Sequence, residues 1–115
     1  MKENSKSSCQ HRENRKEFIY FVRIGEPHER LFKIGTTNNM ERRIKEHKRY
    51  YKKDIQIIGI IPLTSKYTTL RVEKNMIEKW KTFENWIYKR NDRFIIPETV
   101  KQIVITVRKD YVFNI

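Results

Sequence analysis

Residues 18–35, FIYFVRIGEPHERLFKIG, contain two apolar segments separated by a polar segment that favours a turn. The first, 18–24, is rich in β-branched and aromatic residues and ends at Gly25, so it predicts a strand followed by a turn. The second, 31–34, is closed by Gly35 and predicts a shorter strand. The loop between them has about six residues, so we expect the two strands to form an antiparallel hairpin.

The next segment predicts a helix and a third strand. Asn38 stands three residues before Glu41, the spacing of a capping box, so we expect a helix from Met40 to about Lys53. The sequence DIQIIGIIP at 54–62 is apolar at successive positions, which is typical of a strand that is buried on both faces. We therefore expect this third strand in the centre of the sheet.

A second helix is predicted over residues 69–83, with Thr68 as its N-cap. At about 100° per residue, one side of it collects the apolar residues Leu70, Val72, Met76, Ile77, Trp80 and Phe83. Glu73 projects near the centre of that side. A buried, unpaired carboxylate costs roughly several kcal/mol, so Glu73 should be paired with a cation, protonated or bound to a metal ion. From this helix alone, an ion pair with an arginine of a neighbouring element is as good an explanation as a metal site.

The end of the chain has two interpretations. Pro97 can start a last helix, whose apolar residues at helical spacing are Val100, Ile103, Val104, Val107 and Tyr111. The β-branched run 103–107 makes a strand the alternative. Residues 1–16 contain no aliphatic or aromatic residue after the first methionine and predict a flexible basic arm. We expect one α+β domain over 17–115, with a small three-stranded antiparallel or mixed sheet flanked by helices in the order β-β-α-β-α-α.

The charge balance favours a polyanionic partner. The chain has 26 Lys and Arg residues against 14 Asp and Glu, a formal net charge of +12. Aromatic residues lie among the basic ones, which favours nucleic acid over a membrane surface. No apolar run approaches the roughly 20 residues of a membrane span, and no signal peptide opens the sequence, so we expect an intracellular protein without membrane contact. Cys9 is the only cysteine and cannot form an internal disulfide.

The helix predicted over 40–53 carries the candidate binding and catalytic residues. Its outer faces present Arg42, Lys45, Lys48, Arg49, Lys52 and Lys53, which are candidate contacts to DNA phosphates or simply a solvated surface. Arg43, His47 and Tyr50 form a separate stripe between core and solvent. Arginine can bind a phosphate in a bidentate manner, and histidine can transfer protons. If this stripe faces Glu73, the groups for metal-assisted phosphodiester cleavage meet at one place.

These motifs resemble those of the GIY-YIG endonucleases. The tripeptide Phe-Ile-Tyr at 18–20 is similar to the first signature of that family, and Lys-Ile-Gly at 33–35 is similar to the second. Arg43, His47 and Glu73 follow in the same order and in similar positions on the predicted helices. The resemblance extends to residue 86 and includes the predicted order of strands and helices.

The resemblance implies a metal-dependent endonuclease that cleaves duplex or branched DNA with one divalent cation, Mg²⁺ or Mn²⁺. Glu73 would hold the cation, and Arg43 would neutralise the scissile phosphate. Tyr20 would position the attacking water or its hydrogen-bond network, and His47 would assist proton movement or bind phosphate. Asn85 stands roughly where some members of the family have an asparagine that supports the catalytic residues.

Lys33 is the main departure from the pattern, because it replaces the tyrosine of the second signature, as in one branch of the family. It could be the general base with a lowered pKa, a ligand of the phosphate, or a lysine of an edge strand that faces solvent. The same departure supports a second hypothesis, a non-catalytic nucleic-acid-binding module of the same fold. In either case, selection of a DNA site would come from the domain, from the basic arm, or from a protein partner or second copy.

Overall fold

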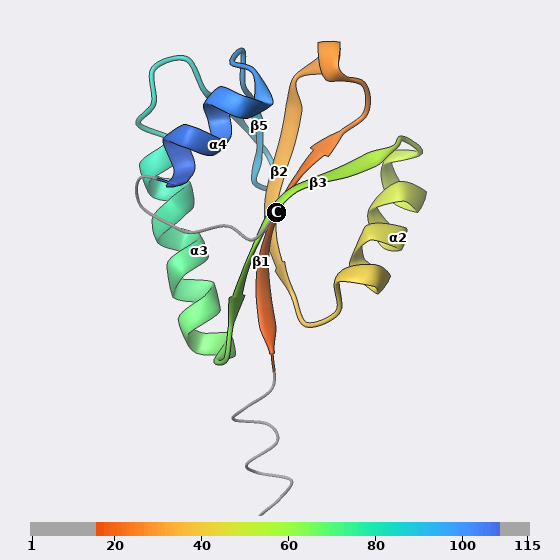
Figure 1. Ribbon diagram of the computed structural model, residues 1–115, viewed down its shortest axis with the longest axis vertical. Helices are drawn as coiled ribbons and strands as arrows, with labels where there is room; N and C mark the ends of the chain where they lie inside the picture. The colour runs from red at the N-terminus through yellow and green to blue at the C-terminus, as the bar shows by residue number, and fades with distance from the viewer. Residues whose placement is uncertain (1–15, 109–115) are drawn as a thin grey trace, which may run out of the picture.

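An antiparallel sheet of five strands forms the centre of the computed structural model, which describes residues 16–108 (Figure 1). The strands are β1 (Glu17–Ile24), β2 (Leu31–Thr37), β3 (Ile55–Leu63), β4 (Ile87–Lys89) and β5 (Arg93–Ile95), arranged in the order β3-β1-β2-β5-β4. The helices are α2 (Met40–Tyr51), α3 (Lys66–Trp80) and α4 (Val100–Arg108), with a short 3₁₀ helix η1 (Pro27–Glu29) in the first loop. α2 lies on one side of the sheet and α3 and α4 lie on the other (Figure 1). The α+β class is therefore confirmed.

The predicted hairpin is present, as β1 and β2 pair from Phe18 opposite Thr37 to Ile24 opposite Leu31. β2 is longer than expected, because the chain continues in the sheet through Gly35 instead of turning there. Gly35 is needed for a different reason: a Cβ atom at this position would collide with the ring and hydroxyl of Tyr20, its partner on β1. The glycine makes room for an aromatic ring across the pair.

Two predictions about the sheet are wrong. β3 lies at an edge of the sheet, and β1 occupies the centre between β3 and β2. β3 is apolar on both faces because helices contact it from both sides, α2 on one and α3 and α4 on the other. The expected three strands are joined by β4 and β5, a second hairpin that pairs with β2 along Leu31–Lys33. Each of these two strands has only three residues, too few to show a clear alternation of apolar and polar residues.

The helix starts also differ in detail from the predictions. Asn39, not Asn38, caps α2, because its side chain accepts a hydrogen bond from the backbone N–H of Arg42 at 3.0 Å. Ser65 caps α3 by accepting from the N–H of Thr68 at 3.3 Å, so α3 begins three residues before the predicted start and ends at Trp80.

The open choice at the end of the chain is settled as a helix. α4 runs from Val100 to Arg108, and Ile103 and Val107 are buried on its inner side. Tyr111, Cys9 and the predicted N-terminal arm up to residue 15 lie outside the described residues. Within the described part of the chain, no helix combines the length and the hydropathy needed to cross a membrane.

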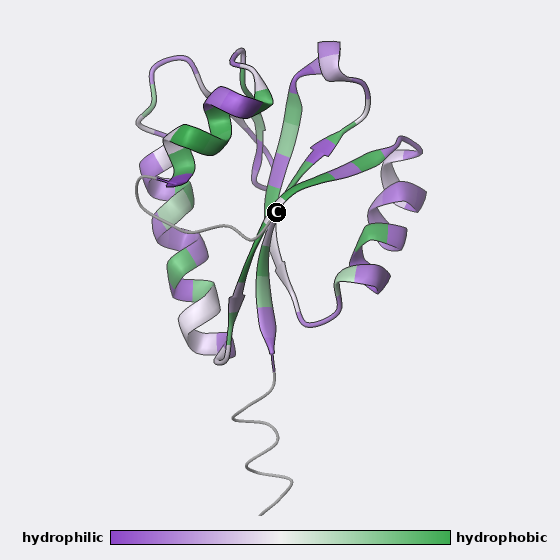
Figure 2. Cartoon of the chain, in the orientation of Figure 1, coloured by the Kyte–Doolittle hydropathy of each residue, from purple (hydrophilic) through white to green (hydrophobic). Residues whose placement is uncertain are grey.

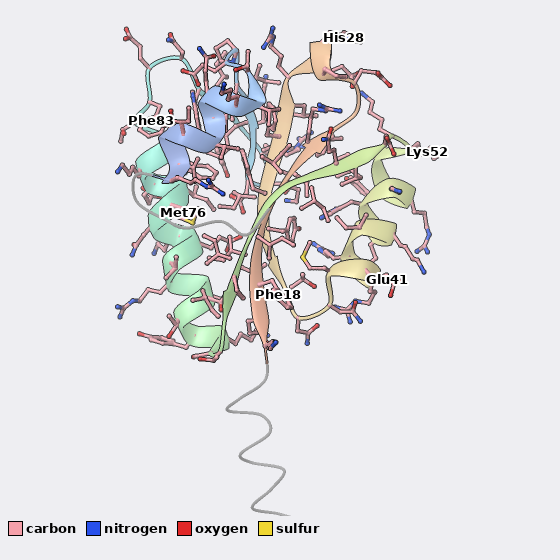
Figure 3. The ribbon with its side chains drawn as sticks, in the orientation of Figure 1. Phe18, His28, Glu41, Lys52, Met76 and Phe83 are labelled. Atoms are coloured by element: carbon pink, nitrogen blue, oxygen red, sulfur yellow. The ribbon has the colours of Figure 1, made fainter. Side chains whose placement is uncertain are left out.

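The two sides of the sheet are packed unequally. The larger core lies between the sheet and the α3–α4 layer and includes Ile19, Phe21, Phe32, Ile34, Met76, Trp80, Trp86, Phe94 and Ile103. The smaller core lies under α2 and contains Tyr20, Val22, Ile24 and Ile55 of the sheet. Three residues of α2 pack against it: Met40, Ile44 and Tyr51. Side chains fill the space between sheet and helices on both sides (Figure 3), but α2 is mostly hydrophilic and α4 mostly hydrophobic (Figure 2). α2 is thus held by a thin apolar layer.

The contact between Gly35 and Tyr20 predicts a specific stability defect. Gly35→Ala should lower the free energy of unfolding by about 1 to 3 kcal/mol, because the added methyl group overpacks the sheet against the Tyr20 ring. Denaturant unfolding measures this loss. In a Tyr20→Ala background the same substitution should cost much less, since the ring is gone. Equal losses in the two backgrounds would show that the ring is not the obstacle.

Candidate functional site

A cavity of about 1000 Å³ opens between α2 and the turn that joins β4 to β5. Its walls are formed by Lys33, Arg43, Glu46, His47, Arg49, Tyr50, Tyr51, Asn91 and Asp92. Three of the predicted catalytic residues, Lys33, Arg43 and His47, are therefore brought together although they come from β2 and α2. Tyr20 and Glu73 do not line the cavity: Tyr20 is hydrogen-bonded to His47 and Arg43, and Glu73 interacts electrostatically with Lys33.

Tyr20 is fully buried beneath α2. Its hydroxyl lies 2.7 Å from Nε2 of His47, and Nε of Arg43 donates a hydrogen bond to it at 3.4 Å. Burial raises the pKa of Tyr20, so the phenol keeps its proton. Because the guanidinium can only donate, the phenol proton is free for Nε2 of His47, and the imidazole then carries its own proton on Nδ1. In this tautomer each of the three groups has a suitable partner.

His47 is held in the neutral form. It is buried against the sheet, and this burial, together with the nearby charges of Arg43 and Lys33, lowers the pKa of His47 to about 4. Near pH 7 the imidazole is uncharged, and its ring lies in the wall of the cavity. A neutral histidine beside two cations can donate a hydrogen bond to an anion without adding a third positive charge.

Lys33 is buried on the floor of the cavity and does not face solvent. Its Nζ donates a hydrogen bond to the backbone carbonyl of Asn91 at 2.6 Å. Burial lowers the pKa of Lys33, Arg43 lowers it further, and the carboxylates of Asp92 and Glu73 act in the opposite direction. The interpretation of Lys33 as a solvent-facing lysine of an edge strand is therefore wrong.

Glu73 is half-buried on α3, and no ion pair joins it to another residue among those described. Burial raises the pKa of Glu73, Asp92 raises it further, and Lys33 lowers it. These interactions couple the carboxylate electrostatically to Lys33 and Asp92, which line the cavity, although α3 lies on the other side of the sheet and contacts β2 from there. The explanation of Glu73 as half of a structural ion pair finds no support in the described chain.

Asn91 and Asp92 are the functional candidates that sequence reasoning missed. They form the turn between β4 and β5, where both have positive φ, 59° and 56°. Asn and Asp tolerate this region better than most other residues, and the pair lies between the short apolar segments Ile87-Tyr88 and Phe94-Ile95. This turn signal could have predicted the hairpin, and with it the second wall of the cavity.

The remaining predicted residues lie around the site. Asn85 is exposed in the segment between α3 and β4, and within the described chain no hydrogen bond links its side chain to the five predicted catalytic residues. The predicted DNA contacts Arg42, Lys45, Lys48, Arg49, Lys52 and Lys53 are all exposed on α2 or just after it. Arg42 and Lys53 are engaged by Glu46 at 3.6 Å and by Glu29 at 2.7 Å, whereas Arg49 lines the cavity. Figure 3 shows Glu41 and Lys52 at the two ends of this basic helix.

Comparison with known proteins agrees with a site for nucleic-acid chemistry. The family model of the T5orf172 domain matches residues 17–108, nearly all of the described chain. This domain is associated with endonuclease-like proteins, which indicates a nuclease-related or DNA-binding function. No curated protein and no solved structure matches the sequence.

The environment of His47 predicts how stability depends on pH. The native state keeps His47 neutral down to about pH 4, whereas the unfolded chain takes up the proton near pH 6.5. The unfolded state binds more protons between these values, so stability falls as the pH falls. Between about pH 7.5 and about pH 5, wild type should lose roughly 2 kcal/mol more than His47→Gln in denaturant unfolding. Parallel losses in the two proteins would contradict a depressed pKa for His47.

Proposed function

This chain belongs to the T5orf172 domain family, and from that premise we propose that it is a metal-dependent endonuclease of the GIY-YIG type that hydrolyses phosphodiester bonds in duplex or branched DNA. The observation that carries the proposal is Glu73, a half-buried carboxylate without an ion-pair partner among the described residues. It interacts electrostatically with Lys33 and Asp92 of a cavity that contains an ammonium, a guanidinium and a neutral imidazole. A phosphate and a divalent cation would complete this set of charges.

The donor set at Glu73 fits Mg²⁺ or Mn²⁺. Mg²⁺ usually keeps several waters and binds through one or two carboxylates and the phosphate of its substrate. Glu73 would be the main protein ligand, and no group of three or more His, Cys, Asp or Glu side chains suited to a metal occurs in the described chain. When bound, the cation would supply Lewis-acid stabilisation of the scissile phosphate.

Arg43 and Lys33 would bind the phosphate. Arg43 uses Nε for Tyr20 and Nη1 for Glu46, at 3.4 and 2.9 Å, which leaves other N–H groups of the guanidinium for a ligand in the cavity. The bond to Glu46 also raises the pKa of Arg43, so it stays charged. Lys33 lies on the floor of the cavity, where its ammonium can reach a phosphate oxygen while it keeps the Asn91 carbonyl.

His47 and Tyr20 would act as a pair. Tyr20 is too buried to touch water or DNA, so we assign it the role of orienting His47 and Arg43 instead of positioning the attacking water. With Nε2 of His47 occupied by Tyr20, the imidazole presents Nδ1–H, which is a donor. His47 would therefore bind a phosphate oxygen, the second of the two roles expected for it.

A non-catalytic DNA-binding module is the alternative function, and Lys33 is the observation that favours it. The residue that replaces the signature tyrosine is tied to a backbone carbonyl and surrounded by other cations, an arrangement suited to holding a phosphate. The assays below separate the two functions, because only the endonuclease cleaves DNA.

Glu73→Gln should keep the fold and the affinity for DNA but lose cleavage by at least about 100-fold, because the amide cannot replace the carboxylate as a metal ligand. Plasmid and branched DNA are incubated with and without Mg²⁺, and binding is measured separately. Glu78→Gln, on the exposed side of the same helix, is the matched control and should cleave like wild type. Cleavage by Glu73→Gln at the control rate would refute the metal assignment, and a wild type inactive with either cation would favour the binding module.

Lys33→Arg should retain cleavage within about tenfold of wild type if Lys33 binds phosphate in its charged form, since arginine keeps the charge. If Lys33 were the general base, the same variant would be inactive, because the guanidinium stays protonated at any usable pH. Circular dichroism and DNA binding show that the larger side chain has been accommodated. A folded, DNA-binding but inactive Lys33→Arg would overturn the phosphate role.

A further inference from the structure

Three cationic side chains form a row across β2 and the two strands of the second hairpin. Lys33 on β2 lies opposite Arg93 on β5, and Arg93 lies opposite Lys89 on β4. Directly opposite residues in antiparallel strands project from the same face of the sheet, and adjacent strands are roughly 4.8 Å apart. We call Lys33, Arg93 and Lys89 the cationic row.

The cationic row lies on the same face of the sheet as α2. Val22, which pairs with Lys33 from the other side, belongs to the core under α2. The row runs from the buried Lys33 through the half-buried Arg93 to the exposed Lys89, and it therefore leads from the floor of the cavity to the edge of the sheet. Next to it on this face, Ile87 of β4 is 56% exposed, so this part of the sheet is open to a partner.

Repulsion between like charges acts along the row: burial lowers the pKa of Lys33 most, and Arg93 lowers it further, against the effect of Asp92 and Glu73, which raise it. Like charges directly opposite each other destabilise a sheet, and here two such pairs share Arg93. Asp92 is the acidic residue of this turn, and its carboxylate accepts a hydrogen bond from the hydroxyl of Tyr88 at 2.9 Å. Arg93 also acts on Tyr51 at the end of α2, whose pKa it lowers against the effect of burial. Nε of Arg93 donates a hydrogen bond to the backbone carbonyl of Arg90 at 2.9 Å, which holds this side chain at the turn between β4 and β5.

We propose that the cationic row is a second DNA-contacting surface, which holds the phosphate backbone on the side of the cavity opposite the basic face of α2. The proposal rests on the proposed function in that DNA is the partner, and it adds a wall that the basic helix alone does not provide. A DNA strand bound there would pass over Lys33 with α2 on one side and the hairpin on the other. The phosphates would relieve the repulsion along the row.

The test is a binding measurement in the Glu73→Gln background, where DNA is not cut. Lys89→Gln is the test variant, since Lys89 is exposed and its removal leaves the cavity intact. Lys74→Gln removes the same charge from the exposed side of α3, and Lys48→Gln removes it from α2. The dissociation constant for a short duplex is measured by fluorescence anisotropy over a range of salt concentrations.

Lys89→Gln should weaken binding by about threefold to tenfold and make the slope of log K against log salt shallower by about 1, as loss of one phosphate contact predicts. Lys48→Gln should weaken binding in the same way, and Lys74→Gln should bind like the Glu73→Gln parent. Lys89→Arg keeps the positive charge and should therefore bind like the parent as well. If Lys89→Gln matches Lys74→Gln while the parent binds DNA, the inference is wrong and the proposed function stands. If the parent itself does not bind DNA, both fail.

Discussion

The close crossing of Tyr20 over Gly35 is the contact on which the site depends. It lies in the middle of the β1–β2 pair, where a glycine leaves room for a ring that would otherwise be pushed off the sheet. The hydroxyl of that ring is thereby fixed under α2, within hydrogen-bond distance of His47 and Arg43. Because the apolar layer under α2 is thin, these polar bonds also help to orient the helix. One backbone position thus links the central strand, the basic helix and the cavity.

Burial has a common effect on the titratable groups around the cavity. It favours the neutral form of His47, Lys33 and Glu73, by lowering the pKa of the first two and raising that of the third. A bound anion would favour the charged form of Lys33, and a bound cation would favour that of Glu73. The proposed phosphate and metal ion would thus each compensate one of these two groups for the water that it loses on burial.

Several features of the fold and site were predictable because they rest on local chemistry. The first hairpin follows from the apolar segments around Gly25, and the inner side of α2 follows from helical spacing. Lys33, Arg43 and His47 line one cavity, as expected from their spacing in the sequence and from the resemblance to the GIY-YIG endonucleases. The edge position of β3 was not predictable from its apolar sequence. An edge strand covered by helices on both faces has the same apolar pattern as a central strand. The second hairpin was missed because its strands are too short for a periodic pattern.

The attachment of that short hairpin has a consequence for the motions of the molecule. β5 pairs with β2 over only three residues, and the turn beyond it supplies the carbonyl that holds Lys33. Elements with few pairing partners open locally at much lower free energy than a central strand. Phe94 of β5 is fully buried in the α3 core against Trp80 and Trp86, so it is the turn between β4 and β5, on the floor of the cavity, that can loosen while the core remains intact. The rate at which a ligand enters or leaves would then be set by the local opening of this turn, and not by the global stability of the domain.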